Sequence, residues 1–321
     1  MEEKELYFAP MEGITGGEFR RVHFRYFGGV DRYYMPFVSP TRDHVFTPRE
    51  LRNIAPENNK GIPVVPQLLT KEPEDFLWAA RSLMDMGYTE VNLNVGCPSG
   101  TVVAKGKGAG LLSDPKKLDR FLEEIFSAGL DLDISVKTRL GMRDPEEFGP
   151  LLEILGKYPI PLLILHPRVR EDYYRRPIRM EAFEAAARSY RGSLCYNGGL
   201  VDVTGLEAFT KNHPNVDKIM VGQGFLADPA LGRKYKGGPA AARAELEGFH
   251  GELYATYLRN FGSSRNAAFH MKELWGYLSR LFEGGDKLFK QLRKAQDAAA
   301  YENAVRRIFA ELPLRDGPDW T

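Results

Sequence analysis

Residues 92–112 read NLNVGCPSGTVVAKGKGAGLL, and they contain the features from which the fold can be worked out. The residues leading into this stretch, Glu90 to Asn94, alternate apolar and polar side chains as a strand does. Cys97 follows and stands directly before Pro98, and a residue that precedes proline is restricted to extended geometry. The stretch therefore predicts a strand that ends in a rigid loop carrying one thiol.

The same loop continues into a run of glycines at positions 106, 108 and 110. Glycine lets the backbone approach a ligand closely and adopt conformations that other residues avoid. A glycine-rich turn with a small buried cysteine is the alternative interpretation, because a lone cysteine most often serves as a packing residue. The rest of the chain has to decide between these two.

Composition limits the class of protein. The chain has 321 residues, of which 27% are charged and 43% hydrophobic, which is typical of a globular protein. Its two cysteines argue against a disulfide framework and against a cysteine-based metal site. The net charge of +1 means that any nucleic-acid surface must be a local patch. The acidic amino terminus and the lack of a long apolar run lead us to expect a cytoplasmic protein without membrane contact.

Eight short apolar runs recur up to about residue 238, and each is followed by a polar or glycine-bearing loop and a helical pattern. Strands that alternate with helices pair in parallel, and eight such units match a closed (β/α)8 TIM barrel. A doubly wound open sheet is the competing architecture. The expected strands are Leu6–Ala9, Arg32–Pro36, Pro63–Leu68, Glu90–Asn94, Asp133–Lys137, Pro161–His166, Ser193–Tyr196 and Asp217–Val221.

The segment 239–321 has helical periodicity and no strand pattern, so we expect a C-terminal all-helical domain after a barrel domain of residues 1–238. Its expected helices are Ala240–Phe261, Asn266–Phe282, Lys287–Ala299 and Tyr301–Leu312.

Polar residues follow the expected strands, and in such a barrel the reactive groups lie at the carboxyl ends of the strands. Phosphate commonly binds the loops after strands seven and eight, where NGGL (197–200) and VGQGFLADP (221–229) supply glycines. The second also fits G-x-G-x-x-A, but a dinucleotide fingerprint belongs in the first strand-helix turn. We therefore expect one phosphate, hence a mononucleotide cofactor, although the glycines could serve only as helix-entry turns.

Lys137 ends the fifth expected strand, where it is either a cofactor contact or a rim charge. An ammonium beside a flavin would stabilise the negative charge of the reduced ring, and Gln67 could pair with the same ring edge through its donor and acceptor. His166 has no second histidine or carboxylate at ligand spacing, so no metal is expected.

Seven ordered motifs carry a resemblance to a known family. APMEGIT (9–15), PQLL (66–69), the 92–112 stretch, VKTRLG (136–141), LHPRVREDYY (165–174), YNGGL (196–200) and VGQGFLADP (221–229) resemble those of the tRNA-dihydrouridine synthases. The resemblance implies an FMN-dependent oxidoreductase that reduces a D-loop uridine of tRNA to 5,6-dihydrouridine and uses NADPH to reduce the flavin again. It implies that FMN is held by Pro10, Met11, Glu12, Gly13, Gln67, Lys137, His166, Asn197, Gly198, Gly199, Gly222, Gln223 and Gly224.

The resemblance also assigns the chemistry. Flavin N5 would deliver hydride to C6 of the base, and Cys97 would donate the proton to C5, which an unperturbed thiol with a pKa of about 8.5 still holds at neutral pH. The substrate contacts would be Asn94, Arg139 and Arg168. The base would have to turn out of its stack, and the helical domain would grip the tRNA backbone. We expect a monomer without an obligate protein partner.

Two positions depart from the family pattern: Gln223 stands where an arginine is usual, and Lys105 and Lys107 make the cysteine loop more basic. Two rival functions remain, an FMN-dependent dihydroorotate or dihydropyrimidine dehydrogenase and a non-catalytic tRNA-binding protein. The sequence leaves open which uridine is modified, whether NADPH or NADH is preferred, and what Gln223 does to FMN affinity.

Overall fold

The computed structural model describes residues 3–320, which divide into two compact units. The first unit consists of the segment ending at Pro10, Arg32–Gly199 and Pro214–Met220. The second consists of Met11–Asp31, Leu200–His213 and the segment that begins at Val221. The expected domain boundary between residues 238 and 239 stays a prediction.

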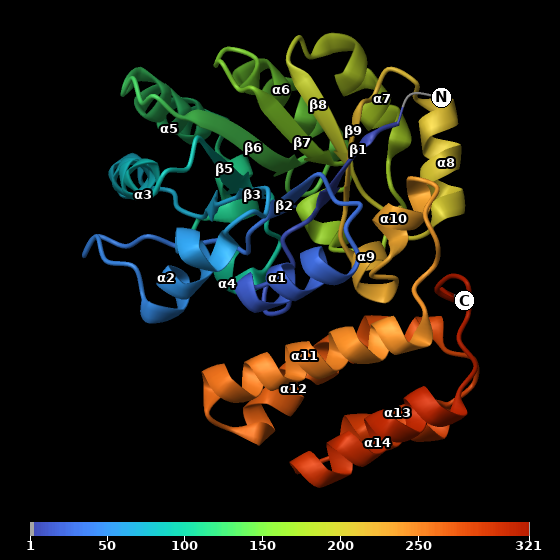
Figure 1. The fold of residues 1–321 in the computed structure, drawn as a ribbon. Coiled ribbons are helices and arrows are strands. Elements are labelled where there is room, and N and C mark those ends of the chain that lie inside the picture. Colours follow the sequence, from blue (N-terminus) through green and yellow to red (C-terminus); the bar gives the residue numbers. More distant parts are fainter. Residues whose placement is uncertain (1–2, 321) are drawn as a thin grey trace. The chain divides into compact units, whose positions relative to one another are not determined.

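The first unit is built on a parallel sheet whose strands follow the order β3-β2-β1-β9-β8-β7-β6-β5-β4. β3 and β4 are the two halves of the single strand expected at 63–68, which Pro66 interrupts because proline has no N–H to donate. The sheet therefore closes on itself, and the expected barrel is confirmed (Figure 1). The strands are β1 (Glu5–Phe8), β2 (Arg32–Tyr34), β3 (Val64–Val65), β4 (Gln67–Leu68), β5 (Glu90–Val95), β6 (Asp133–Arg139), β7 (Leu162–His166), β8 (Ser193–Asn197) and β9 (Lys218–Val221).

Amphipathic helices cover the outside of these strands, as Figure 1 shows for α3, α5, α6 and α7. In α5, the buried residues Leu118, Phe121, Leu122 and Ile125 recur every three or four positions, which puts them on one face toward the sheet. The helices of the first unit are α2 (Pro48–Ile54), α3 (Pro73–Asp85), α4 (Gly100–Val103), α5 (Pro115–Ser127), α6 (Phe148–Leu155) and α7 (Met180–Ser189).

The barrel interior is apolar on one side and polar on the other. The apolar cluster comes from β1, β2, β3, β7, β8 and β9, and consists of Tyr7, Ala9, Tyr34, Val65, Leu162, Ile164, Cys195 and Met220. The polar side comes from β4, β5 and β6, and its side chains bond to one another in a chain. Asn94 Nδ2 donates to Gln67 Oε1 (2.7 Å), Gln67 Nε2 to Asn92 Oδ1 (2.8 Å), and Asn92 Nδ2 to Ser135 Oγ (2.9 Å).

The direction of this chain is fixed at both of its ends. Ser135 donates to the carboxylate of Glu90 at 2.7 Å, and that carboxylate, paired with the Arg32 guanidinium, can only accept. At the other end Asn94 Oδ1 accepts from the backbone N–H groups of residues 96 and 97, which can only donate. Every side-chain amide between them therefore has one orientation that satisfies its neighbours.

The second unit is helical. Figure 1 shows its last four helices as two pairs, α11 with α12 and α13 with α14. Its helices are α1 (Gly17–Tyr26), α8 (Val203–Asn212), α9 (Gln223–Ala227), α10 (Leu231–Tyr235), α11 (Arg243–Phe261), α12 (Ser264–Leu278), α13 (Asp286–Lys294) and α14 (Ala298–Glu311). Within residues 3–320, none of the helices has the length and apolar character of a membrane span.

Three side chains from α11, α12 and α14 make a polar centre in the core of this unit. His250 Nε2 lies 2.8 Å from the Tyr301 hydroxyl and accepts the Trp275 indole N–H at 3.1 Å. Burial lowers the pKa of His250 to about 3, so its imidazole is neutral and can accept a hydrogen bond.

Candidate active site

Cys97 lies two residues beyond the carboxyl end of β5, at the end of the barrel where catalytic groups are expected. It is half-buried, and it is not in a disulfide. Its thiol is close enough to Lys137 and Arg139 to influence the pKa values of both. The prediction that this thiol lies on a loop beyond a strand, rather than in the apolar interior, agrees with this placement.

The peptide group that joins Gly96 to Cys97 is held from both sides. Its N–H donates to Asn94 Oδ1 at 2.9 Å, and its carbonyl accepts from Arg139 Nε at 3.0 Å. The carbonyl of Cys97 itself accepts from the N–H of Ala109 at 3.1 Å. The backbone on both sides of the thiol is therefore fixed by hydrogen bonds.

Glycines allow the loop to fold back onto the cysteine. Gly108 has φ of +57°, and a Cβ atom placed there would lie 2.9 Å from Cys97 Cβ. A Cβ at Gly110 would lie 2.9 Å from the carbonyl oxygen of Val103. These two glycines are thus required by close contacts inside the loop, and this accounts for them without a ligand.

Lys137 faces the same end of the barrel, opposite Asn94 in the register of β5 and β6. Burial, followed by the repulsion of the Arg139 guanidinium, lowers the pKa of Lys137 to about 8. Within residues 3–320, its ammonium has no hydrogen-bond or ion-pair partner. A half-buried cation without an anion is costly, so this position suits a negatively charged ligand.

His166 is held in one tautomer by its neighbours. Arg168 can only donate, so His166 Nε2 accepts from Arg168 Nη1 at 3.1 Å, and Nδ1 carries the proton toward Asn197 Oδ1 at 3.4 Å. Asn197 Nδ2 in turn donates to the Met220 carbonyl at 2.8 Å. Burial, together with the charges of Arg139, Lys137 and Arg168, lowers the pKa of His166 well below its usual value, which agrees with a neutral ring.

Gln67 is fully buried, and the polar chain uses one of its donors and one lone pair of its carbonyl oxygen. One N–H and one acceptor position are left, which is the paired pattern expected for contact with a flavin ring edge. Gly198 and Gly199 follow β8, and Gly199 has φ of +66°. A Cβ at Gly198 would lie 2.6 Å from Ile178 Cδ1, so the backbone is closely packed there.

The other expected cofactor residues begin at Pro10, which closes the first segment of the first unit, and continue in the second unit. Residues 11–15 form a turn, in which the Met11 carbonyl accepts from Ile14 and Thr15 and the Gly13 carbonyl lies 3.3 Å from His270 Nδ1. Glu12 is exposed.

Gly222 immediately precedes α9, and Gln223 begins that helix. A Cβ at Gly224 would lie within 2.9 Å of Leu231 and Val201, so this glycine serves close packing. A role of these residues in phosphate binding stays a prediction.

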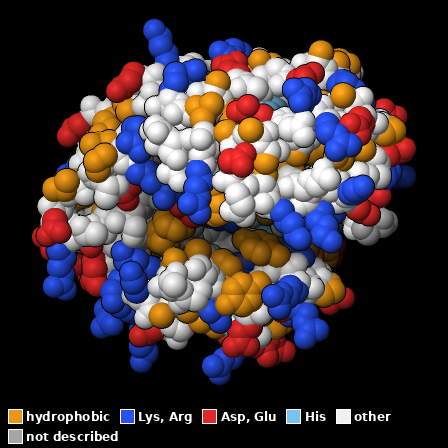
Figure 2. Space-filling view, turned by 90° about the horizontal axis from the view of Figure 1, so that it is seen from below, with side chains coloured by type: hydrophobic (Ala, Val, Ile, Leu, Met, Phe, Trp, Pro, Cys, Tyr) orange, Lys and Arg blue, Asp and Glu red, His pale blue; other side chains and the backbone are white. Residues whose placement is uncertain are grey.

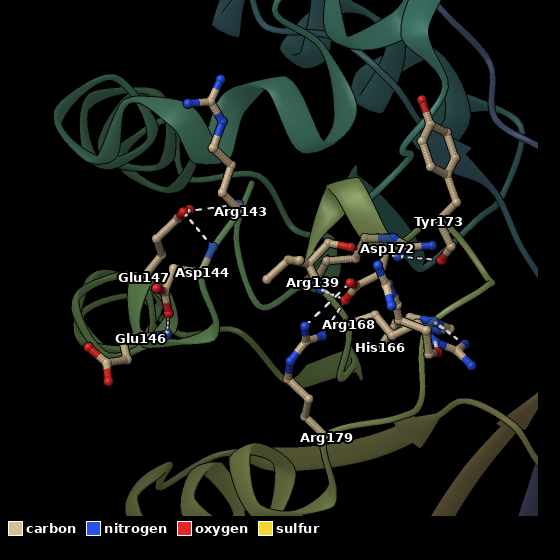
Figure 3. Close-up of polar contacts among 12 residues, drawn as sticks. Arg139, Arg143, Asp144, Glu146, Glu147, His166, Arg168, Asp172, Tyr173 and Arg179 are labelled. Carbon is tan, nitrogen blue, oxygen red and sulfur yellow. Dashed lines mark hydrogen bonds and ion pairs between the residues drawn. The ribbon is translucent and has the colours of Figure 1, made fainter.

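The loop after β7 surrounds Arg139 (Figure 3). Asp172 accepts from the Val169 N–H at 3.0 Å and from both terminal nitrogens of Arg179. Burial alone would raise the pKa of Asp172, but Arg179 and the Val169 N–H outweigh it and hold the pKa below its usual value. Tyr173 follows with φ of +49°, a conformation that bulky side chains rarely adopt.

Sequence reasoning missed Asn92, Ser135 and Asp172 as members of the site's support. A signal for the first two existed, because the period-two alternation of a strand puts Asn92 on the same face as Asn94 and Ser135 on the same face as Lys137. Asp172 had no such signal, because its partners are a backbone N–H and an arginine beyond a turn.

Basic residues of the second unit gather on α13. Leu288, Phe289 and Leu292 are buried there, whereas four cations are exposed: Lys287, Lys290, Arg293 and Lys294. Over the face of the molecule in Figure 2, Lys and Arg side chains are spread among acidic and apolar ones. This mixed distribution agrees with a net charge of +1.

Comparison with solved structures identifies the architecture. Morphinone reductase superposes with a TM-score of 0.54 at 12% identity, over 74% of this chain and 87% of that one. An old yellow enzyme homologue from Zymomonas mobilis gives a TM-score of 0.53 at 11% identity, over 74% and 90%. At these identities the likeness concerns the fold alone.

Comparison of sequences reaches the family. A tRNA-dihydrouridine(16) synthase from Ralstonia nicotianae is 29% identical over 98% of this chain and 98% of its own length. A probable tRNA-dihydrouridine synthase from Staphylococcus epidermidis is 28% identical over 96% and 94%. The family model described as dihydrouridine synthase (Dus) matches residues 7–311, almost the whole chain. The barrel and the loop that carries Cys97 agree with this match, and the chain belongs to the dihydrouridine synthase family.

Proposed function

We propose that this protein reduces a uridine in the D loop of tRNA to 5,6-dihydrouridine, with FMN as cofactor and NADPH as the reductant. The observation that carries the proposal is the half-buried thiol of Cys97, fixed by its backbone at the same end of the barrel as the Lys137 ammonium, which has no ion-pair partner among residues 3–320. Family membership supports the reaction class. The names of the relatives support tRNA as the substrate.

The donor set at the barrel mouth fits FMN. In the described part of the chain the Lys137 ammonium meets no anion, and Gln67 keeps one donor and one acceptor for a ring edge. His166 and Asn197 lie at the ends of neighbouring strands, with Gly198 and Gly199 next in the chain. When bound, FMN supplies the hydride for C6 of the base. The contacts expected from Pro10, Met11, Glu12, Gly13, Gly222, Gln223 and Gly224 are part of the same proposal.

The chain's own residues would hold the base and supply the proton. Cys97 keeps a proton at Sγ and donates it to C5 of the uracil ring. Asn94, whose Oδ1 already holds the amides of residues 96 and 97, would orient the ring, and Arg168 would contact the RNA. The substrate contact expected of Arg139 stays a prediction. The Lys137 ammonium stabilises negative charge that develops at the barrel mouth.

Two measurements test the function. The first is mass spectrometry of tRNA from cells that lack the gene, which should show loss of dihydrouridine at one position. The Ralstonia nicotianae relative is named for position 16, so that position is examined first. Complementation with the wild type should restore the modification, whereas Cys97→Ala should not. A full complement of dihydrouridine in the deletion strain would refute the proposal.

The second measurement separates the rival functions. Purified Cys97→Ala should bind FMN as the wild type does, because the proposed FMN contacts do not include the thiol, while its reduction of tRNA should collapse. Free orotate and free pyrimidines should not be turned over by the wild type. Turnover of these small molecules in preference to tRNA would favour a dihydropyrimidine dehydrogenase instead.

A further inference from the structure

Arg139 connects two loops at the mouth of the barrel. It is only 2% exposed, and it bonds to three backbone carbonyls. Nε donates to Gly96 at 3.0 Å, and Nη1 donates to Val169 at 3.2 Å. Nη1 also donates to Tyr173 at 2.9 Å (Figure 3). One side chain thus ties the loop after β5 to the loop after β7.

The first of these bonds ends on the peptide group that precedes the thiol. Asn94 holds the N–H of that peptide, and Arg139 holds its carbonyl. Two side chains therefore set its orientation, and with it the direction in which the Cys97 side chain leaves the backbone. Loss of the Arg139 bond would leave the Gly96 carbonyl without this hydrogen bond, so that only the N–H side of the peptide stays held.

The loop after β7 brings its carbonyls to Arg139 by means of Asp172. This carboxylate gathers the Val169 N–H and the Arg179 guanidinium, and the chain then turns through Tyr173 in the left-handed region. Arg139 donates a hydrogen bond to the carbonyl of this strained residue, Tyr173. Strain of this kind persists only where the surroundings determine it, which points to a use for the acceptor delivered there.

The outer side of this loop has the chemistry that binds nucleic acid. Tyr174 is 57% exposed, and its ring lies 5.1 Å from the Arg139 guanidinium. Arg175 and Arg176 are exposed beside it. Aromatic rings stack on bases and guanidinium groups bind phosphates, so an RNA strand would meet this loop directly.

We infer that Arg139 is a positioning residue that couples RNA contact at the 167–176 loop to the geometry of the Cys97 thiol. A displacement of the loop moves the carbonyls of Val169 and Tyr173, these move Arg139, and Arg139 turns the peptide before the cysteine. The catalytic consequence rests on the proposed function, whereas the mechanical link belongs to the chain itself.

The link is tested by the rate at which iodoacetamide alkylates Cys97 in the purified full-length protein without tRNA, followed by mass spectrometry of the peptide. Cys195 is fully buried and serves as the internal reference. Arg139→Met keeps the length of the side chain and removes its donors, and Asp172→Asn loosens the loop while Arg139 stays. Each change should raise the alkylation rate constant of the Cys97 thiolate, obtained from the pH dependence of the reaction, about tenfold.

Arg143→Lys is the matched control. Arg143 pairs with Glu171 of the 167–176 loop, but its side chain is 80% exposed, and among residues 3–320 no hydrogen bond joins it to residues 92–112. In Arg143→Lys, the alkylation rate of Cys97 should stay within twofold of the wild-type rate. Circular dichroism before each measurement shows that a variant is folded. Arg139→Lys, which retains a donor, should lie between Arg139→Met and the wild type.

The double variant decides whether the effect passes through Arg139. In the Arg139→Met background, Asp172→Asn should change the rate less than twofold, because the connection is already broken. A full tenfold effect of Asp172→Asn in that background would overturn the inference, as would unchanged rates in both single variants.

Activity is measured separately, so that the two proposals can fail independently. With tRNA as substrate, Arg139→Met should lower kcat about tenfold and leave KM nearly unchanged. A loss of activity with an unchanged alkylation rate would show that Arg139 contacts the base directly, and this would overturn the positioning role. A wild type that makes no dihydrouridine but gives the expected alkylation pattern would refute the function and leave the link intact.

Discussion

Replacement of Gly108 by alanine should displace the thiol, whereas replacement of Gly106 should not. Both glycines are in the left-handed region, with φ of +57° and +70°. A Cβ at position 108 would lie 2.9 Å from Cys97 Cβ and 3.0 Å from its carbonyl oxygen. A Cβ at position 106 would meet nothing nearer than Lys71 Cδ, at 3.5 Å. The two substitutions share their backbone strain and differ in contact with the cysteine.

The expected losses of stability follow from that difference. A side chain in the left-handed region costs about 1 kcal/mol, so Gly106→Ala should lower the free energy of unfolding by roughly that amount. Gly108→Ala adds an overpacked contact, which typically costs about 1–3 kcal/mol, and its total should be about 2–4 kcal/mol. Urea denaturation gives the free energy of unfolding of each variant. The values are comparable when the slope m of free energy against urea concentration is the same for both variants.

The same pair tests the role of the thiol. Gly108→Ala should reduce dihydrouridine formation about tenfold or more, because a small displacement of a reacting group costs much of its effect. Gly106→Ala should stay within twofold of the wild type, and both should bind FMN normally. Equal losses of stability in the two variants would refute the geometric reasoning. A fully active Gly108→Ala protein with a stability loss of several kcal/mol would refute the catalytic placement of Cys97.

Three further predictions concern charge and buried polar groups. Since the pKa of Lys137 is lowered to about 8, FMN affinity measured by fluorescence titration should fall by up to about tenfold per pH unit above pH 8, and Lys137→Met should not show this fall. Ser135→Ala leaves Asn92 Nδ2 without its acceptor and should lower the free energy of unfolding in urea by about 1–3 kcal/mol. Ser193 is the control, because its side chain makes no hydrogen bond among residues 3–320. Ser193→Ala should change the free energy of unfolding by less than about 0.5 kcal/mol. The pKa of His250 is about 3 in the folded protein and about 6.5 in the unfolded chain, so the unfolded chain binds the proton first as the pH falls. A fall from pH 7 to 5 should therefore lower the free energy of unfolding of the wild type by about 2 kcal/mol. His250→Gln should lack this contribution.

The barrel was predictable because each strand is a short apolar run that ends at a polar or glycine residue. The third run shows the limit of this signal. Its apolar letters continue through Pro66, yet the missing N–H of proline divides it into β3 and β4. The bounds of the other strands differ from the expected ones by one or two residues, as is usual where hydrogen bonding decides the end of an element.

The placement of the candidate site residues was predictable only where the side chains are distinctive, and their roles stay predictions. Cys97, Lys137 and His166 are distinctive residues after distinctive strands, and the structure brings them to one end of the barrel. The contacts of Arg139 could not be foreseen, because its partners are backbone carbonyls from loops about 30 or more residues apart in sequence. Every residue has a backbone carbonyl, so the amino-acid sequence does not reveal which carbonyls accept a hydrogen bond from Arg139.

The way in which position 97 is held has a consequence for engineering. Three hydrogen bonds at this position use main-chain groups of residues 96 and 97. A different side chain of similar size, such as serine, therefore keeps these three hydrogen bonds. Side chains with different pKa values can therefore be placed at position 97 one at a time while the surrounding backbone stays the same. The reaction rate can then be plotted against the pKa of the proton donor.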